Sequence, residues 1–353
     1  MNTDTLTAEL KEYALSQGVD LIGVTSARPF VKRDKAKTFI DPKELLEDAQ
    51  SVVVTAFYNY NIIEGPVPDA DIPRGRFPRA DRMGALTPMT DHCEAVIKGF
   101  LEGRGYKAVT NASHDYRLPE KMAAVRAGIG KYGKNGVILT REYGSYVRLV
   151  TLVTDAPLAY EEYELYASDC GDCDLCIKAC PTGAIYEPYR VRQDMCITDW
   201  LWGTFIPIPL REKQENRLFG CGLCVEACPR NQELAPRKEY PVKTEDACIA
   251  PELIPLVTGD EDFFRKSLPS FPMQAGMDAL RGNAIIALGN SGTDKAVEPL
   301  CLALTHPNRQ IRAYAAWALG RRGGARAEKA LEKALEGEAD REVRKEMALG
   351  LGR

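Results

Sequence analysis

The chain contains the stretch CGDCDLCIKACPTGAI at residues 170–185, and this stretch decides how the middle of the protein is organised. Its pattern is C-x2-C-x2-C-x3-C followed by proline, formed by Cys170, Cys173, Cys176 and Cys180. A second run, C-x2-C-x3-C followed by proline, is formed by Cys221, Cys224 and Cys228. Cys196 lies alone between the two runs. Runs of this kind are typical of proteins that hold two 4Fe–4S clusters.

The spacing also predicts which cysteines share a cluster. In a paired arrangement, the cysteine before the proline binds the cluster of the other run. The first cluster is therefore predicted to bind Cys170, Cys173, Cys176 and Cys228. The second is predicted to bind Cys180, Cys196, Cys221 and Cys224. Zinc is the alternative, because C-x2-C pairs also build zinc ribbons, but zinc explains neither the triple spacing nor the prolines.

The composition indicates an intracellular protein of two or three domains. The 353 residues carry a net charge of -4 at pH 7, so the whole chain shows no bias towards nucleic acid. The first residues, MNTDTLTAELKEYALSQG, lack the apolar centre of a signal peptide, and no apolar run is long enough to span a membrane. We expect a cytoplasmic monomer without membrane contact, in which clustered cysteines bind metal rather than form disulfides.

The part before the cysteines, residues 1–165, has the pattern of an α/β domain. Helical spacing covers residues 6–17 and 93–103, whereas residues 21–24, 51–57 and 146–153 are predicted strands. This alternation favours a sheet with helices packed on its faces. The loop at residues 65–88 carries a basic cluster that either is solvated or contacts an anionic substrate, formed by Arg74, Arg76, Arg79 and Arg82.

The part after the cysteines contains a repeat. An apolar residue followed by arginine recurs about every thirty residues, at Leu280-Arg281, Ile311-Arg312 and Val343-Arg344, each time before an alanine- and leucine-rich run. This period predicts a short HEAT-like helical solenoid over residues 251–353, which leaves 166–250 as a ferredoxin-like dicluster module. His306 falls in a turn between repeats and is expected to be an ordinary surface residue.

Many basic side chains lie in this tail. If they share one face, they would bind the phosphates of RNA; otherwise they pair with glutamates at helical spacing such as Glu328, Glu332 and Glu336. The basic residues are Arg281, Arg309, Arg312, Arg321, Arg322, Arg326, Lys329, Lys333, Arg341, Arg344 and Lys345.

Taken together, the motifs resemble the epoxyqueuosine reductase family over nearly the whole chain. The cysteine runs match, and so does AGIGKYGKNGVILTREYGS at residues 127–145, which is similar to the family's AGLGWxGK segment. Further matches are DPKELLEDAQSVVVTAFYNY (41–60), VTDAPL (153–158), NRLFGCGLCVEACPRN (216–231), RGNAIIALGN (281–290) and RAYAAWALG (312–320).

The resemblance implies an oxidoreductase that converts epoxyqueuosine to queuosine in tRNA. It implies an α/β domain that binds cobalamin, a dicluster module and a HEAT-like tail that holds tRNA. An external donor, ferredoxin or flavodoxin, would reduce the clusters, and these would reduce the cobalamin. The resemblance places cobalamin contacts along residues 128–155, including Ile138 and Leu149, and near Thr198.

The chain departs from the family where substrate is expected. The family has an aspartate followed by proline, then a glutamate six residues after the aspartate. Here residues 113–121 read SHDYRLPEK, so counting back six from Glu120 reaches His114, with Asp115 next to it. We predict Asp115 as the general acid, with His114 as the alternative, because opening a carbon–oxygen bond requires a proton.

Two other functions compete with this interpretation. A paralogous corrinoid reductase acting on another substrate, for instance a small epoxide or halide, would explain the departures. A non-catalytic electron-transfer protein with two clusters and a helical docking tail would explain the cysteines alone. Bound corrin separates the second alternative from the others, and binding of tRNA separates the first.

Overall fold

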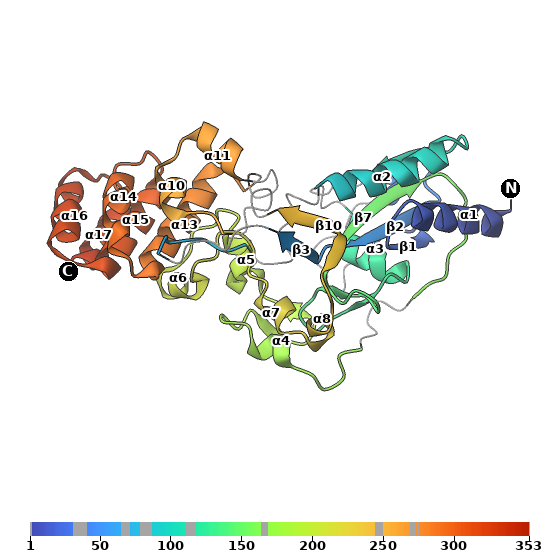
Figure 1. The fold of residues 1–353 in the computed structure, drawn as a ribbon, viewed down its shortest axis with the longest axis horizontal. Coiled ribbons are helices and arrows are strands. Elements are labelled where there is room, and N and C mark those ends of the chain that lie inside the picture. Colours follow the sequence, from blue (N-terminus) through green and yellow to red (C-terminus); the bar gives the residue numbers. More distant parts are fainter. Residues whose placement is uncertain are drawn as a thin grey trace.

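The computed structural model describes residues 2–30, 41–64, 71–77, 87–110, 118–163, 169–243, 250–268, 273 and 275–352. Three parts follow one another along the chain and lie along the long axis of the molecule (Figure 1). The α/β part is at one end, the cysteine-rich part lies in the middle and the helical tail is at the other end.

Four strands form an antiparallel sheet in the order β1-β2-β7-β4. Their bounds are β1 (Leu21–Ser26), β2 (Ser51–Tyr58), β7 (Val147–Thr154) and β4 (Ala108–Thr110). Every residue of β2 is buried, because this strand lies between two neighbours and under helices on both faces. The β-branched run that predicted a buried strand is therefore confirmed.

Helices cover the two faces of this sheet. Helices α1 (Thr3–Ser16) and α2 (Thr87–Glu102) lie on one face, and α3 (Glu120–Arg126) lies on the other. Alternate residues of β2 point to opposite faces, so Val53 packs with α1 and α2 while Val54 packs with α3. The predicted sheet with helices on its faces is confirmed.

Three further two-stranded pairs are described, and one of them connects this domain to the rest of the chain. The parallel pair joins strands on either side of the cysteine-rich part, and the other two pairs are antiparallel hairpins. The pairs are β3 (Asn61–Glu64) with β10 (Arg237–Lys243), β5 (Lys131–Tyr132) with β6 (Ile138–Leu139), and β8 (Ile185–Glu187) with β9 (Arg190–Val191).

The cysteine-rich part consists of short helices between loops. The helices are α4 (Leu175–Lys178), α5 (Ile197–Trp200), α6 (Ile208–Gln214), α7 (Leu223–Glu226) and α8 (Pro229–Gln232). Proline begins α8 directly after Cys228, where its missing N–H group costs no helical hydrogen bond. Single 3-10 turns lie at Pro42–Glu44, Gln193–Met195 and Asp294–Ala296.

The tail is a stack of helices, which confirms the predicted HEAT-like solenoid. Its helices are α10 (Leu253–Thr258), α11 (Glu261–Ser267), α13 (Met277–Ser291), α14 (Val297–Ala303), α15 (Arg309–Arg322), α16 (Ala325–Gly337) and α17 (Arg341–Gly350). Of the described helices, none is long and apolar enough to cross a membrane.

One hydrophobic core continues from the tail into the cysteine-rich part. Trp200 and Phe219 belong to the same buried cluster as the helices of the tail. Arg211 of α6 is fully buried and donates to both carboxylate oxygens of Glu346 in α17, at 2.7 and 2.8 Å. The boundary at residue 250, like that at 165, stays a prediction, and the two parts on either side of it pack as a unit.

Candidate functional site

The first cysteine group brings together thiols from both runs. Burial raises the pKa of Cys176, and the neighbouring thiols of Cys170, Cys228 and Cys173 raise it further. Cys228, from the second run, likewise has its pKa raised first by burial and then by Cys170 and Cys173. These four thiols are the set that the spacing assigns to the first cluster.

The second cysteine group contains the other four thiols. Burial, followed by Cys221, Cys196, Cys176 and Cys180, raises the pKa of Cys224 to about 12. Burial also raises the pKa of Cys221, and its thiol neighbours are Cys196 and Cys180. Because Cys176 of the first group acts on Cys224, the two groups lie next to each other.

Cys180 differs from its neighbours in the direction of its pKa. Burial acts to raise this pKa, but hydrogen bonds from the backbone of Ile185, Thr182 and Ala184 outweigh burial and lower it. Its sulfur also lies 3.6 Å from the hydroxyl of Thr182. Donors of this kind stabilise a thiolate, which is the form that binds iron.

All ten described cysteines are free thiols, so no disulfide competes for the two groups among them. The described residues contain no set of three or more His, Cys, Asp or Glu side chains that could hold a single metal ion. A four-iron cluster gives each thiolate its own iron, so its ligands are further apart than those of one ion. Cys173 is exposed, whereas the second group lies deeper.

The predicted cobalamin contacts lie in two different surroundings. The hydroxyl of Thr198 accepts a hydrogen bond of 3.0 Å from the backbone N–H of Cys221, which places Thr198 against the second cysteine group. Ile138 and Leu149 are 2% and 8% exposed within the core of the α/β part. Any contact that these two residues make with a ligand would therefore come mainly from their backbone.

A lysine of α3 lies beside the second cysteine group. Lys121 keeps an exposed surface, yet desolvation by the surrounding protein is the main cause that lowers its pKa. Cys196 and Cys224 are among its charged neighbours, and its ammonium donates to the carbonyl of Gly136 at 3.0 Å. Next to it, burial raises the pKa of Glu120, which Arg148 partly offsets.

A cavity of about 540 Å³ lies where the α/β part meets the cysteine-rich part. Its lining is aromatic and polar, and consists of Tyr60, Arg76, Phe77, Tyr146, Glu226, Asn231 and Gln232. Asn231 fixes one wall, because its amide bonds both the backbone and the hydroxyl of Ser145 at 2.9 and 2.8 Å. Cavities of this size and lining are typical of small-molecule sites.

The predicted acid residues lie outside the described residues, because His114 and Asp115 belong to the segment 111–117. Of the basic loop cluster, Arg79 and Arg82 also lie outside them. Arg76 bonds both carboxylate oxygens of Glu226, at 2.5 and 2.7 Å, and Arg74 pairs with Glu252 at 3.1 Å. The charges of these two arginines are therefore neutralised by the protein rather than presented to a substrate.

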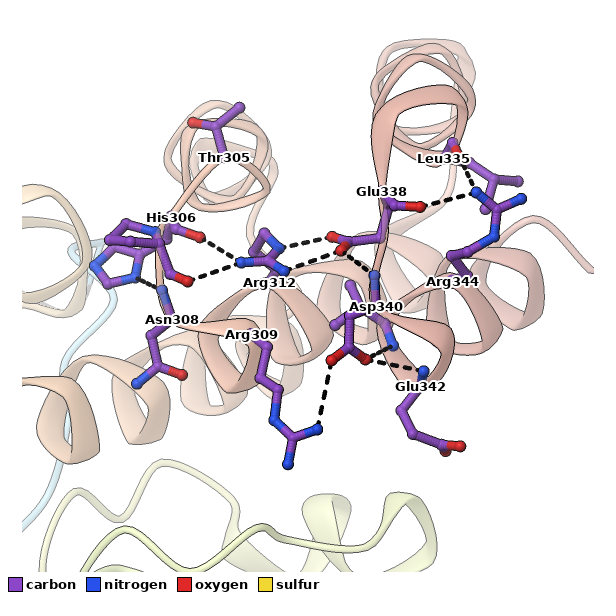
Figure 2. A network of polar contacts seen from close by, with 12 residues as sticks. Thr305, His306, Asn308, Arg309, Arg312, Leu335, Glu338, Asp340, Glu342 and Arg344 are labelled. Atoms are coloured by element: carbon purple, nitrogen blue, oxygen red, sulfur yellow. Dashed lines mark hydrogen bonds and ion pairs between the residues drawn. The ribbon is translucent and has the colours of Figure 1, made fainter.

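The recurring arginines of the tail are internal parts of the repeat. Arg312 bonds both carboxylate oxygens of Glu338, at 2.6 and 2.9 Å, and the carbonyls of His306 and Pro307 at 2.9 Å (Figure 2). Arg344 donates to the carbonyls of Leu335 and Glu338 in the same way (Figure 2). The internal contacts of this pair therefore account for its recurrence in the repeat, and a contact of these arginines with RNA stays a prediction.

Other basic residues of the tail pair with acidic residues of the tail or of the cysteine-rich part. Arg321 pairs with Glu212 of α6, and Arg322 pairs with Asp294 at 2.8 Å. Within the described part of the tail, four exposed basic residues on α16 and α17 form no ion pair, and they are Lys329, Lys333, Arg341 and Lys345. His306 is also corrected: its Nδ1 accepts from the backbone of Asn308 and its ring is mostly buried.

Sequence reasoning passed over Glu120 and Lys121 as parts of the site. The count back from Glu120 used this glutamate only as a marker for its neighbours. No pattern in the chain indicates that the first turn of α3 lies beside Cys196 and Cys224, because this contact depends on how two parts pack. The only feature of the sequence that could have pointed to these two residues is that an acid and a base are adjacent.

Comparison with known proteins matches two family descriptions to this chain. The first, "4Fe-4S double cluster binding domain", covers residues 169–231, and the second, "HEAT repeats", covers residues 273–352. The first match includes all eight cysteines of the two groups and confirms the prediction of two 4Fe–4S clusters. The second confirms the repeat in the tail.

Full-length relatives are also similar. Epoxyqueuosine reductase from Bacillus subtilis is 33% identical over 99% of this chain and 96% of its own length. The enzyme of the same name from Listeria monocytogenes is 31% identical over 97% of this chain and 96% of its own length. A solved epoxyqueuosine reductase with an epoxyqueuosine-modified stem loop of tyrosine tRNA has a TM-score of 0.87 and 30% identity, covering 99% of both chains. A Bacillus subtilis structure described with its catalytic aspartate loop swung out of the active site has a TM-score of 0.84 and 31% identity, covering 99% of both chains.

Proposed function

Since the chain belongs to the epoxyqueuosine reductase family, we propose that it reduces epoxyqueuosine to queuosine in tRNA, using two 4Fe–4S clusters and a cobalamin. The observation that carries this function is the likeness, over 99% of both chains, to a reductase solved with its modified tRNA stem loop. A tRNA substrate and clusters with thiolate ligands both suit the reducing cytoplasm.

We assign the cluster ligands from the two cysteine groups. Cys170, Cys173, Cys176 and Cys228 hold the first cluster, and the other four hold the second. The mutual effects of these thiols on one another's pKa support the assignment, because only close thiols act in this way. Bound clusters supply one-electron transfer, and the raised thiol pKa values mean that iron must displace protons to bind.

Cobalamin fits the space between the α/β part and the second cysteine group. Two observations support this placement: Lys121 of the α/β part lies beside Cys196 and Cys224, and a cavity with three aromatic rings lies where the α/β part meets the cysteine-rich part. Thr198 would border the bound cofactor, with backbone contacts from Ile138 and Leu149. Cobalamin, when bound, supplies a strongly reducing cobalt centre that reacts with carbon. The surrounding protein would orient it and exclude water.

Opening the epoxide requires a proton at the oxygen that leaves carbon. We keep Asp115 as the donor, with His114 as the alternative, and the catalytic aspartate loop described for the Bacillus subtilis enzyme supports a donor from a loop.

The arrangement suggests the direction of electron flow. The first cysteine group contains the exposed Cys173, whereas the second contains the more buried Cys224 and lies beside Lys121 of the α/β part. We propose that a ferredoxin or flavodoxin reduces the first cluster, which reduces the second. The second cluster then lies next to the cofactor that it has to reduce.

The function can be tested in a bacterial strain that lacks its own epoxyqueuosine reductase. Expression of this chain should convert epoxyqueuosine to queuosine in tRNA, as measured by mass spectrometry of the nucleosides. Asp115→Asn should abolish the conversion if it is the donor, and His114→Gln should abolish it if the role lies there. Unchanged epoxyqueuosine with soluble, cluster-loaded protein would contradict the proposed function and favour a paralogous reductase of small substrates.

A further inference from the structure

We propose that Lys134 positions the first cluster and sets its reduction potential. This proposal rests on the proposed function only in one respect, namely that the first cluster receives the donor's electrons. Lys134 lies in the turn between β5 and β6 of the α/β part. Its ammonium donates to the carbonyls of Gly171 and Cys173 at 2.6 and 2.9 Å. Both carbonyls belong to the loop that presents Cys170 and Cys173.

Lys134 differs from the lysines around it in the groups that its ammonium contacts. Lys131 pairs with Asp169 at 2.8 Å, and Lys178 pairs with Asp174 at 2.9 Å. Among the described residues, Lys134 has no such carboxylate partner, and its contacts are backbone carbonyls. Its side chain is also partly buried, whereas the side chain of Lys178 is 69% exposed. Lys134 therefore brings to the loop around the first cluster a positive charge that forms no direct ion pair, and the carboxylate of Asp174, which interacts with it at longer range, is already paired with Lys178.

The same turn also contacts the loop of the second cluster. The amide of Asn135 donates to the carbonyl of Cys224 at 3.3 Å, and its oxygen accepts from the backbone of Val137. The backbone of Tyr189 in the cysteine-rich part donates to the carbonyl of Lys134 at 2.9 Å. One short turn thus connects both cluster loops to the α/β part, so its side chains fix the positions of these loops relative to the α/β part.

A cation at this position favours the reduced cluster. Reduction by the ferredoxin or flavodoxin adds one electron to the cluster, and no covalent bond forms or breaks. A cluster with four thiolate ligands is an anion, and reduction makes it more negative by one charge. A nearby ammonium attracts the more negative state more strongly, so it raises the reduction potential. The second cluster lacks this contact with Lys134 and should respond less.

The test is a redox titration of the purified protein with both clusters, followed by electron paramagnetic resonance. It needs neither tRNA nor cobalamin, so its result is independent of the proposed reaction. The signal of the first cluster is the one that Cys170→Ser removes. In Lys134→Gln, we expect the ratio of oxidised to reduced first cluster at a fixed potential to rise about three- to tenfold, a tenfold rise corresponding to about 59 mV.

Two control variants make the result specific. Lys134→Arg keeps the charge and should keep the wild-type potential, while Lys178→Gln removes an exposed, paired lysine and should change it far less. An unchanged potential in Lys134→Gln, an equal change in both clusters, or an equal change in Lys178→Gln would overturn the proposal. Loss of the first cluster in Lys134→Gln but not in Lys134→Arg would support it, and loss in both would overturn it.

Discussion

At the scale of single residues, the pKa values of the thiols in the two cysteine groups determine which thiols must lose a proton when iron binds. Burial raises the pKa of Cys176, Cys221, Cys224 and Cys228, so these thiols hold their protons until a metal replaces them. Cys180 is the exception, because backbone donors lower its pKa. Each group contains one ligand from the other run, so neither cluster can be complete without both runs in place.

This crossing of ligands gives a prediction. Cys228→Ser should remove the same cluster as Cys170→Ser, because the thiols of both residues act on Cys176. Cys180→Ser and Cys196→Ser should remove the other cluster. Each variant should retain about four of the eight irons of the intact protein, measured by iron analysis and electron paramagnetic resonance. If Cys228→Ser and Cys221→Ser removed the same cluster, the crossed assignment would be wrong, and bound zinc in place of iron would contradict the clusters themselves.

At the scale of helices and turns, arginines connect successive repeats of the tail. Arg312 of α15 reaches the turn before its own helix and Glu338 after α16, and Arg344 of α17 reaches the end of α16 (Figure 2). The side chain of Glu338 is 5% exposed, and Arg312 is the main cause that lowers its pKa. These arginines therefore connect successive helices and turns of the tail.

Removing Arg312 should therefore destabilise the tail. Arg312→Ala leaves the carboxylate of Glu338 buried without its partner, which costs about 2–4 kcal/mol. The matched control is Arg309→Ala on the same helix, whose side chain is 72% exposed and which should cost less than about 1 kcal/mol. Urea unfolding of the cluster-free chain, followed by circular dichroism, measures both. Equal losses for the two variants would contradict the internal role of Arg312.

His306 should make the tail sensitive to acid. Desolvation is the main cause that lowers its pKa from 6.5, and the charges of Arg281 and Arg312 lower it further. The unfolded chain therefore binds a proton more readily than the folded chain, so stability falls as the pH drops through and below about 6.5. His306→Gln should reduce this fall in a series of thermal melts between neutral and mildly acidic pH. A fall of the same size in both proteins would exclude His306 as its source.

The repeat in the tail could be predicted from the sequence, but the role of its arginines could not. A recurring Leu-Arg or Ile-Arg pair reports the period, because a periodic fold places equivalent residues in equivalent positions. Whether Arg312 points to solvent or into a turn depends on the neighbouring repeat, which the pair itself does not encode. The two-cluster region could be predicted because metal geometry restricts the spacing of its cysteines, whereas Lys121 comes to lie beside Cys196 and Cys224 through the packing of separate parts.

At the scale of the whole molecule, the tail and the cysteine-rich part form a continuous unit. The shared core and the buried pair of Arg211 with Glu346 hold the tail against the dicluster region. The parallel pair of β3 and β10 connects the same region to the α/β part. A substrate held by the tail would therefore keep a defined position relative to the clusters. The order of the sheet strands could not be predicted, since similar strand patterns fit many orders.

The exposed basic residues of α16 and α17 are the remaining candidates for RNA contact in the tail. Replacing Lys329 and Lys333 together with glutamate, or Arg341 and Lys345 together, should weaken binding of a tRNA stem loop and reduce the slope of log affinity against log salt by about one for each lost phosphate contact. Fluorescence anisotropy at several salt concentrations measures this. Unchanged affinity and slope in both double variants would place the RNA contacts elsewhere.

The most direct test of the central claim is turnover by purified components. Anaerobically reconstituted protein with about eight irons, cobalamin and a reductant should convert epoxyqueuosine to queuosine in a tRNA stem loop. Omission of cobalamin, or loss of one cluster through Cys228→Ser, should abolish the conversion, measured by mass spectrometry of the released nucleosides. Fully loaded protein that binds cobalamin yet leaves epoxyqueuosine in the stem loop unchanged would contradict the account.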